Sequence, residues 1–365
     1  MPTSHQLSCP PHGGGPPSRL AVIYCVRGSL ANIQKTLDCL QSQSAVGRIE
    51  LVLTADSPTL LQEAEASVRG RGVLVDPRFL LHESTDLATA RLMAAKEASA
   101  EIMTIAEDHS FPDANFAEEL LEVFASCSRI LAASPNMHNP NPDSPVSRAQ
   151  FLLTHGMLEP VSSFRRTEDV ARLPWHNTTY RRTAFLAAAR DAGFIQVESL
   201  LQEEIRRLYP QARFVHCHRT ALWHVNMSLL APAVHHAFDG GRIFGAERAR
   251  YHLWGFGARL LHALAFPLAA LLKVVRCMPF LWDRRSIGRS LATLSSACLL
   301  AFVHAMGEAV GVLWGKGESA MTYTRYECDR SGFSRADERH LLMSGVAESE
   351  PSAGPHASRS RRATA

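Results

Sequence analysis

The sequence lacks the features that would place it in several large classes of protein. Its eight cysteines contain no C-x-x-C pair and no regular spacing, which favours reduced thiols in a cytosolic setting over a disulfide framework. A formal net charge of only +3 gives no reason to expect nucleic acid as the main partner. Residues 1–18 are rich in Pro, Gly and Ser instead of apolar, so no signal peptide is expected. At 46% hydrophobic residues, however, the chain can build a substantial core.

Composition divides the 365 residues into four regions. Residues 1–18 predict a disordered leader, because such a stretch cannot bury a core. Residues 19–250 carry alternating strand and helix patterns, and residues 251–318 are strongly apolar. Residues 319–365 are polar with a basic end, and we expect them to form a largely disordered tail.

Short apolar runs alternate with helical patterns through the first half of the chain. Ser29 and the pair Ser57-Pro58 follow the first two runs and are typical helix starts. Repeated strand–helix units predict an α/β fold with a mostly parallel sheet that helices cover on both faces. Ligands of such sheets bind beyond the carboxyl ends of the strands. The predicted strands span residues 20–26, 49–54, 72–76 and 101–106.

The strongest local feature is the triplet Glu107-Asp108-His109, which directly follows a predicted buried strand. Two acids and an imidazole at the carboxyl end of a strand can hold a divalent ion, which in turn neutralises a diphosphate. The alternative is an acidic loop in which Asp113 merely caps the next helix. The position at the end of a strand favours the functional interpretation.

Several pieces, in order, resemble a family-2 glycosyltransferase with the GT-A nucleotide-sugar-binding fold. LAVIYCVRGSLANIQKTLDCLQSQ resembles the first strand and helix, and IELVLTADSP the second strand with its nucleotide loop. ATARLMAAKEASAEIMTIAEDHSFPDANFAEELLEVF is similar to the helix, strand and acidic metal motif. LPWHNTTYRR resembles the acceptor-side segment, and VESLLQEEIRRLYPQARFVHCHRTALWH the segment that supplies the catalytic base. The resemblance covers about residues 19–250.

The resemblance implies roles for particular residues. Val26, Arg27 and Asp56 would hold the nucleotide, while Glu107, Asp108 and His109 would position a divalent metal ion on the diphosphate. The family's usual Asp-x-Asp motif here reads Glu-Asp-His, so His109 would take the last ligand position. Imidazole is a plausible ligand for Mn²⁺ and a poorer one for Mg²⁺.

The resemblance also points to a catalytic base at the start of a predicted helix over 197–208. A hydroxyl nucleophile must lose its proton as it attacks the anomeric carbon, and a positioned carboxylate accepts that proton. Glu198 matches the family position best. Glu203 and Glu204 are alternatives, although both are also ordinary solvated helix acids.

Other polar residues are assigned less directly. The family often places a histidine after the strand that ends near His224, where it can reach the metal ion or the diphosphate. Arg242 can pair with phosphate oxygens through its planar fork. On the acceptor side, the resemblance implies Trp175, His176 and Asn177, with buried packing as the alternative for Trp175.

The run His216-Cys217-His218 suggests zinc. On a strand, His216 and His218 would share a face while Cys217 points to the other. Three ligands from one short segment, even with His224 nearby, are a weak zinc signal without a distant partner pair. A zinc hydrolase therefore stays as one alternative function.

Two apolar segments, about 258–282 and 288–314, follow the predicted catalytic domain. Their uncharged runs are short or borderline for crossing a membrane. The connector between them carries Arg284, Arg285 and Arg289, which oppose a two-span hairpin. We therefore expect helices that lie in the cytoplasmic leaflet or form a re-entrant pair, on the cytoplasmic face of the membrane. The alternative is a soluble hairpin packed on the catalytic domain or on a second subunit.

These observations together predict an inverting, metal-assisted glycosyltransferase that uses a nucleotide-sugar donor. The acceptor would be a hydroxyl of a sugar, a lipid-linked molecule or a polypeptide. The first alternative is a membrane-associated interaction protein that keeps the fold and has lost catalysis, since the acidic motif is altered.

Overall fold

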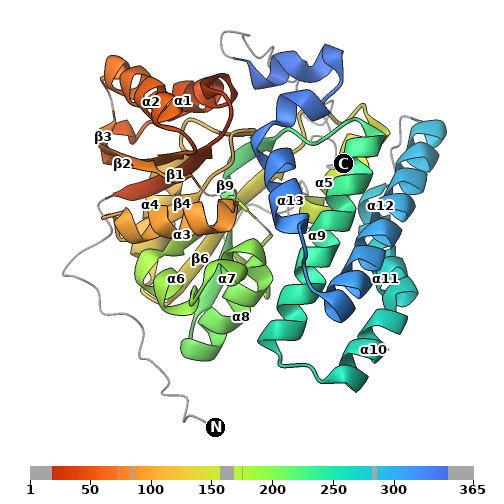
Figure 1. Cartoon of the computed structure of the whole chain (residues 1–365). Helices are drawn as coiled ribbons and strands as arrows, with labels where there is room; N and C mark the ends of the chain where they lie inside the picture. Colours follow the sequence, from red (N-terminus) through yellow and green to blue (C-terminus); the bar gives the residue numbers. More distant parts are fainter. Residues whose placement is uncertain are drawn as a thin grey trace, which may run out of the picture.

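The computed structural model describes residues 19–72, 74–83, 86–156, 168–174, 176–281 and 286–343. Within these residues nine strands form one sheet in the order β3-β2-β1-β4-β8-β6-β9-β5, with β7 paired to β9 (Figure 1). The strands are β1 (Leu20–Val26), β2 (Ile49–Ala55), β3 (Val75–Leu81), β4 (Ile102–Ile105), β5 (Ser110–Pro112), β6 (Ile130–His138), β7 (Glu168–Asp169), β8 (Thr179–Arg181) and β9 (Arg213–His224).

The strand directions bring distant parts of the chain to one edge of the sheet. Strands β3, β2, β1 and β4 are parallel, and β8 is antiparallel to both of its neighbours, β4 and β6. Strand β6, and β9 parallel to it, therefore run in the direction of β1 again. The carboxyl ends of β1, β4 and β9 thus share an edge with the amino end of β8. The predicted α/β fold class is confirmed, although the sheet is mixed instead of mostly parallel.

Helices cover both faces of the sheet because the strands are apolar on both sides. Along β1, Leu20 and Val22 pack into one core, while Ala21 and Ile23 pack into the other. The predicted cap at Ser57 is present, since its hydroxyl accepts a hydrogen bond from Leu60 N at the start of α2. The first face carries η1 (Leu30–Ile33), α1 (Gln34–Gln41), α2 (Pro58–Arg71) and α4 (Phe116–Ser126), with η2 (Val46–Arg48) before β2. The second carries α3 (Leu87–Glu97), α6 (Arg182–Ala188), α7 (Ala192–Gln196) and α8 (Glu198–Leu208).

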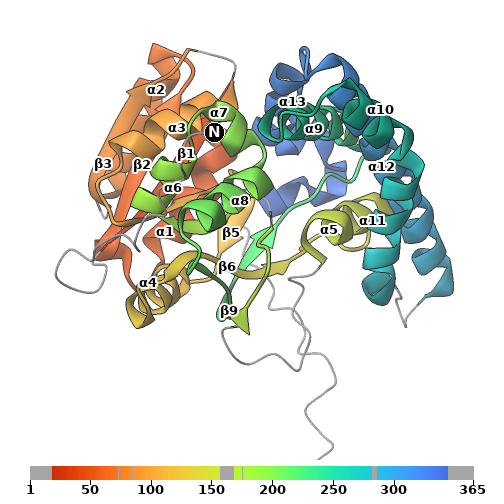
Figure 2. The same cartoon turned by 90° about the horizontal axis from the view of Figure 1, so that it is seen from below.

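The apolar region forms a helical layer beside the sheet (Figure 2). Its helices are α9 (Leu230–Tyr251), α10 (Phe256–Leu264), α11 (Phe266–Leu281) and α12 (Ile287–Trp314), and α5 (Pro145–His155) packs against α11 and α12. The predicted apolar hairpin is thus present as the packed pair α11 and α12.

Helices α9 and α12 approach each other closely because each carries two glycines four residues apart. A Cβ added at Gly241 or Gly245 of α9 would overlap the backbone carbonyl of His304 or Glu308. Gly307 and Gly311 of α12 meet the α9 backbone in the same way. Such small-xxx-small pairs let helix backbones come into contact.

The predicted disordered tail from residue 319 is wrong for its first part. Residues 319–343, named the closing segment below, form α13 (Ser319–Cys328), η4 (Arg330–Phe333) and η5 (Ala336–Leu342). Figure 1 shows α13 between the sheet and the α9–α12 layer. The segment docks on the rest of the protein through polar contacts and through Tyr326, Phe333 and Leu342, which pack against the core. The predicted leader, residues 1–18, and residues 344–365 lie outside the described part of the chain.

Candidate active site

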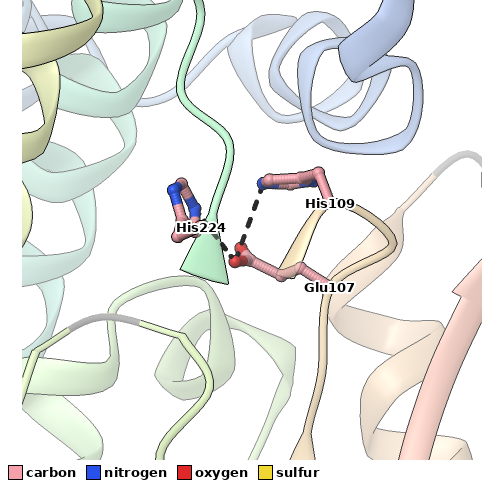
Figure 3. A group of neighbouring side chains, drawn as sticks. All are labelled: Glu107, His109 and His224. Atoms are coloured by element: carbon pink, nitrogen blue, oxygen red, sulfur yellow. Dashed lines mark ion pairs between the residues drawn. The ribbon is translucent and has the colours of Figure 1, made fainter. Parts of the chain in front are cut away.

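Three side chains, two from the β4–β5 connection and one from the end of β9, converge at the carboxyl edge of the sheet (Figure 3). Glu107 follows β4, His109 precedes β5 and His224 ends β9. Glu107 Oε2 lies 3.3 Å from His224 Nε2 and 3.7 Å from His109 Nε2. The three residues are only 3%, 0% and 6% exposed, respectively. This burial argues against the solvated acidic loop that was the alternative from the sequence, because unpaired charges are rarely buried so deeply.

Asp108 orients His109. The Asp108 Oδ1 atom lies 2.8 Å from His109 Nδ1, and Arg330 Nη2 lies 2.8 Å from His109 Nε2. An arginine can only donate a hydrogen bond, so Nε2 is the acceptor and Nδ1 carries the hydrogen that Asp108 receives. Burial and the charge of Arg330 lower the pKa of His109 well below its usual value, which agrees with a neutral ring. Asp108 thus accepts a hydrogen bond from the His109 nitrogen that faces away from the cluster, as carboxylates commonly do from metal-ligating histidines.

The donor atoms of Glu107, His109 and His224 lie within 4.8 Å of one another and could hold a metal ion. A second group of the same kind shares Glu107 with His176 and Glu327. Among the described residues, the buried Glu107 Oε1 atom has no hydrogen-bond partner. Two imidazoles and a carboxylate suit borderline ions such as Mn²⁺ or Zn²⁺ better than Mg²⁺. These residues therefore fit the divalent ion that the sequence predicted.

The neighbours of Glu107 keep its carboxyl group charged. Burial alone raises its pKa, but His176, His224 and Arg91 outweigh burial and hold the pKa well below the usual value. Asn177 Nδ2 donates a hydrogen bond of 2.7 Å to Glu107 Oε2. The charged Glu107 carboxylate beside imidazole rings therefore offers ligand atoms to a divalent cation.

Glu198, the predicted catalytic base, is the first residue of α8 and faces this cluster. Its Oε2 atom accepts a hydrogen bond of 3.0 Å from His176 N, and the Tyr180 hydroxyl lies 3.5 Å away. Burial, only partly opposed by Arg91, raises the pKa of Glu198 to about 8. The His176 Nδ1 atom lies 3.7 Å from Glu107 Oε1 and 3.9 Å from Glu198 Oε1, so one ring joins the two carboxyl groups.

The alternative bases point elsewhere. Glu203 is exposed, and Glu204 pairs with Arg190 and Arg207 and accepts a hydrogen bond from the Tyr251 hydroxyl. Of the three candidates, Glu198 is the one that reaches the cluster.

His176 and Asn177 enter the cluster through an unusual backbone. Both are non-glycine residues with left-handed conformations, with φ of 63° and 56°. Such strain costs about 1–3 kcal/mol per residue and concentrates at functional sites. In this backbone conformation the His176 amide donates a hydrogen bond to Glu198, and the Asn177 side chain donates one to Glu107. Trp175, the third predicted acceptor-side residue, lies outside the described residues.

The predicted nucleotide-binding residues lie at the same edge, on the first two strands. Val26 ends β1 beside Ala55 of β2. Arg27 and Asp56 follow these strands, with 4.0 Å between Arg27 Nε and Asp56 Oδ2. The carboxyl edge of the sheet thus holds both predicted groups, and the nucleotide role of the first group stays a prediction.

Arg242, predicted to bind phosphate, is engaged elsewhere. It lies in α9 and donates from Nε to the Gly315 carbonyl oxygen, 2.9 Å away, beyond the end of α12. The guanidinium group thereby satisfies a backbone carbonyl that the helix leaves free. It does not join the cluster of Glu107 and its neighbours.

The structure does not bring His216, Cys217 and His218 together as the ligands of a zinc ion. His216 and His218 do share a face of β9, with ring centroids 4.0 Å apart, while Cys217 is buried in the core. Among the described residues, neither possible metal group includes any of these three. His224 belongs to the Glu107 group at the other end of β9.

Sequence reasoning missed four buried residues that surround the cluster: Arg91, His155, Glu327 and Arg330. Arg91 of α3 lies 3.3 Å from His176 Nδ1, and the His155 ring lies 4.8 Å from that of His224. Arg91 and His155 sit within ordinary helical patterns, so periodicity alone could not single them out. The signal for the other two was the charged run Glu327-Cys328-Asp329-Arg330, which interrupts a segment expected to be disordered.

Comparisons with known proteins find a limited structural similarity and no match by sequence. No protein-family model and no curated protein sequence matches the chain. The crystal structure of S. aureus TarS residues 1–349 matches over 63% of this chain and 65% of its own, with a TM-score of 0.45 and 14% sequence identity. The same protein in complex with UDP-GlcNAc matches with a TM-score of 0.42 and 16% identity. The similarity thus spans just under two thirds of the TarS chain and concerns the fold alone.

Proposed function

We propose that the chain is a nucleotide-sugar-dependent glycosyltransferase that inverts the anomeric centre. The observation that carries this proposal is the buried cluster of Glu107, His109 and His224, faced by Glu198 at the carboxyl edge of an α/β sheet. A site for a divalent cation beside a buried carboxyl group can serve transfer from a sugar diphosphate to a hydroxyl, because the cation offsets charge on the leaving group and the carboxylate accepts the proton.

The reaction is a single displacement. The Glu198 carboxylate takes the proton of the acceptor hydroxyl as its oxygen bonds to the anomeric carbon, and the bond from that carbon to the diphosphate breaks. The Tyr180 hydroxyl and the His176 amide hold the carboxylate in place. A divalent ion held by Glu107, His109 and His224 would offset the charge that develops on the leaving diphosphate. The donor set of two imidazoles favours Mn²⁺ over Mg²⁺ in this role.

Turnover of UDP-, GDP- and TDP-sugars in the presence of Mn²⁺, with sugar and lipid-linked acceptors, tests the proposal. We expect release of one nucleoside diphosphate per sugar transferred, and loss of release when a chelator removes the ion. The absence of turnover together with the absence of donor binding would reject the proposal.

A catalytically inactive relative is the second candidate. The observation that favours it is the Glu-Asp-His triplet, whose last residue accepts a hydrogen bond from Arg330. Metal titration followed by nucleotide titration separates the two candidates, because an inactive relative of this kind should show no metal-dependent nucleotide binding.

We further propose that the α10–α12 layer lies on a membrane surface. Helix α12 is the single helix in the described residues that is long and apolar enough to span a membrane, a criterion that buried core helices also meet. Helices α10 and α11, bent by 53° at their junction, reach that length together. Glu308, in the last third of α12, pairs with Arg248 of α9. Of the most apolar stretch of α12, 44% is buried in the protein. A helix tied in this way to a charged neighbour is better suited to the interface than to the bilayer core. The exposed apolar residues of the layer include Phe256, Leu261, Leu264, Leu268, Leu271, Val275, Ile287 and Leu291.

A cysteine in place of Ser286, just before α12, tests the topology in a variant whose exposed Cys298 is replaced by serine. We expect no labelling of intact cells by an impermeant thiol reagent. Labelling specific to the Ser286→Cys variant would reveal a two-span hairpin. The predicted connector arginines Arg284 and Arg285 lie outside the described residues.

A further inference from the structure

The closing segment covers the candidate active site. Its helix α13 contributes Glu327 to the second possible metal group, and η4 contributes Arg330 to His109. A cavity of about 20 Å³ lies between Arg91 and His176 on one side and Tyr323 of α13 on the other. Pockets for small molecules and cofactors measure about 300–1,000 Å³. Glu107, His109 and Glu198 are themselves buried, so a nucleotide sugar would reach them only if part of their cover moved.

Polar contacts hold much of this segment in place. Asn32 Nδ2 donates to the Cys328 carbonyl oxygen and Lys35 Nζ to the Leu341 carbonyl oxygen, each at 2.9 Å. Asn141 Nδ2 donates to Glu338 Oε2, also at 2.9 Å. Hydrogen bonds to protein can be exchanged for hydrogen bonds to water at a small net cost. Tyr326, Phe333 and Leu342 add apolar contacts with the core, so polar and apolar contacts together dock the segment.

Arg330 is an unusual residue to bury here. It is 4% exposed, with Nη2 at 2.8 Å from His109 Nε2 and 3.6 Å from Glu327 Oε1. Among the described residues, its Nε and Nη1 atoms have no hydrogen-bond partner. A buried cation with two unused donors is costly, whereas a planar guanidinium group matches the oxygens of a diphosphate. The free donors indicate that an anion is the missing partner.

The hydrogen bond of Arg330 also excludes a metal ion from His109. The Nδ1 atom of His109 is committed to Asp108, so Nε2 offers the one remaining lone pair. Arg330 occupies that lone pair, and a metal ion in the Glu107 group would need the same one. Arg330 and the metal ion therefore compete for one atom.

We propose that Arg330 is an exchangeable partner of the site. It occupies His109 Nε2 when no donor is bound, and it moves to the diphosphate when the metal ion and donor enter. This inference rests on the proposed function. It adds that the closing segment supplies a binding residue for the diphosphate and makes binding of the metal ion and of the nucleotide interdependent.

Binding measurements on the full chain test this, with Arg330→Ala beside Arg325→Ala, an exposed arginine of the same segment. Calorimetry first measures the binding of Mn²⁺ alone. In excess Mn²⁺ it then measures the binding of UDP, GDP and TDP and, separately, of their free nucleosides. For Arg330→Ala we expect Mn²⁺ alone to bind about fivefold more tightly, because a competitor is gone. The nucleoside diphosphate that the wild type binds best should bind about tenfold more weakly, with its nucleoside unchanged. Arg325→Ala should match the wild type throughout.

Unchanged diphosphate affinity in Arg330→Ala, or equal losses for diphosphate and nucleoside, would overturn the inference alone. A wild type that binds none of the nucleotides would overturn the proposed function and the inference with it. If Arg330→Ala does not fold, Arg330→Gln is measured in its place, with the same expectations.

Hydrogen–deuterium exchange of the wild type gives a second readout. Adding Mn²⁺ and the bound nucleoside diphosphate should alter exchange at residues 327–334. Identical exchange there, with saturating ligand, would contradict the proposal.

Discussion

Replacing Glu198 with glutamine should remove activity and at the same time stabilise the fold. Burial raises the pKa of the Glu198 carboxyl to about 8 in the folded chain, against an ordinary value of 4.5. The folded protein therefore holds a proton that the unfolded chain releases. The contribution of Glu198 to the free energy of unfolding of the wild type must then fall as the pH rises from about 4.5 to about 8. Above about pH 8 this contribution stays level. Glutamine does not ionise, so the variant escapes this loss.

The magnitude follows from the interval between the two pKa values. Each pH unit in this window costs the wild type about 1.4 kcal/mol. At pH 7, about 2.5 pH units above the ordinary value, Glu198→Gln should be more stable by about 3 kcal/mol, and at pH 4.5 the two proteins should be equal. Turnover should fall about 10²-fold or more, because the general base is lost.

Urea unfolding at several pH values between 4.5 and 8 measures the first effect, and donor turnover measures the second. The matched control is Glu203→Gln, an exposed carboxylate on the same helix, which should change neither. In the wild type, kcat/KM should rise with pH because the base must lose its proton, and this limb should be absent in the variant. A stability difference that does not grow with pH would refute the burial argument. Full turnover in Glu198→Gln would refute the catalytic assignment.

The remaining predictions concern the metal group and the helical layer. His109→Ala should weaken Mn²⁺ binding about tenfold or more in calorimetry. His216→Ala, outside the possible metal groups, is the control and should leave Mn²⁺ binding unchanged. Equal Mn²⁺ affinities of the two variants would show that His109 is not a metal ligand. Gly245→Val should lower the free energy of unfolding by about 1–3 kcal/mol, because the added carbons overlap the α12 backbone. Gly257→Ala, in open space on α10, is its control, and equal denaturation midpoints for the two variants would disprove the close packing. Gln at Leu261, Leu264 and Leu268 together should reduce sedimentation with anionic vesicles, and unchanged sedimentation would argue against the membrane surface.

The structure also changes one expectation about truncation. From the sequence, deleting residues 252–365 should release a soluble catalytic domain unless the apolar hairpin packs on it. Helix α12 does pack along α9, through Gly241 and Gly245. The deletion would also remove Glu327 and Arg330 from the candidate site. We therefore expect the deletion to expose apolar surface and to weaken binding of the nucleoside diphosphate, because Arg330 is lost.

Local patterns determined a large share of this protein. Short apolar runs alternating with helical periods specify buried strands and their covering helices, and strand direction then puts the ends of β1 and β4 at one edge. The triplet Glu107-Asp108-His109 could be recognised for the same reason, since it follows a strand. These inferences hold because each depends on residues that are neighbours in sequence.

Only the tertiary structure decided which groups meet. Because β8 runs antiparallel to β4, His176 and Asn177, which precede β8, lie at the edge of the sheet where β4 ends. The hydrophobic periodicity of the sequence does not predict this direction. Asp108 pairs with His109 instead of joining Glu107, and Arg330 reaches the other nitrogen of that ring from 221 residues further along the chain. Contacts over such separations depend on how whole elements pack, and the hydrogen bonds that orient a side chain form only after that packing. The sequence alone therefore identifies the edge of the sheet where the candidate site lies, while only the folded chain shows which residues meet there.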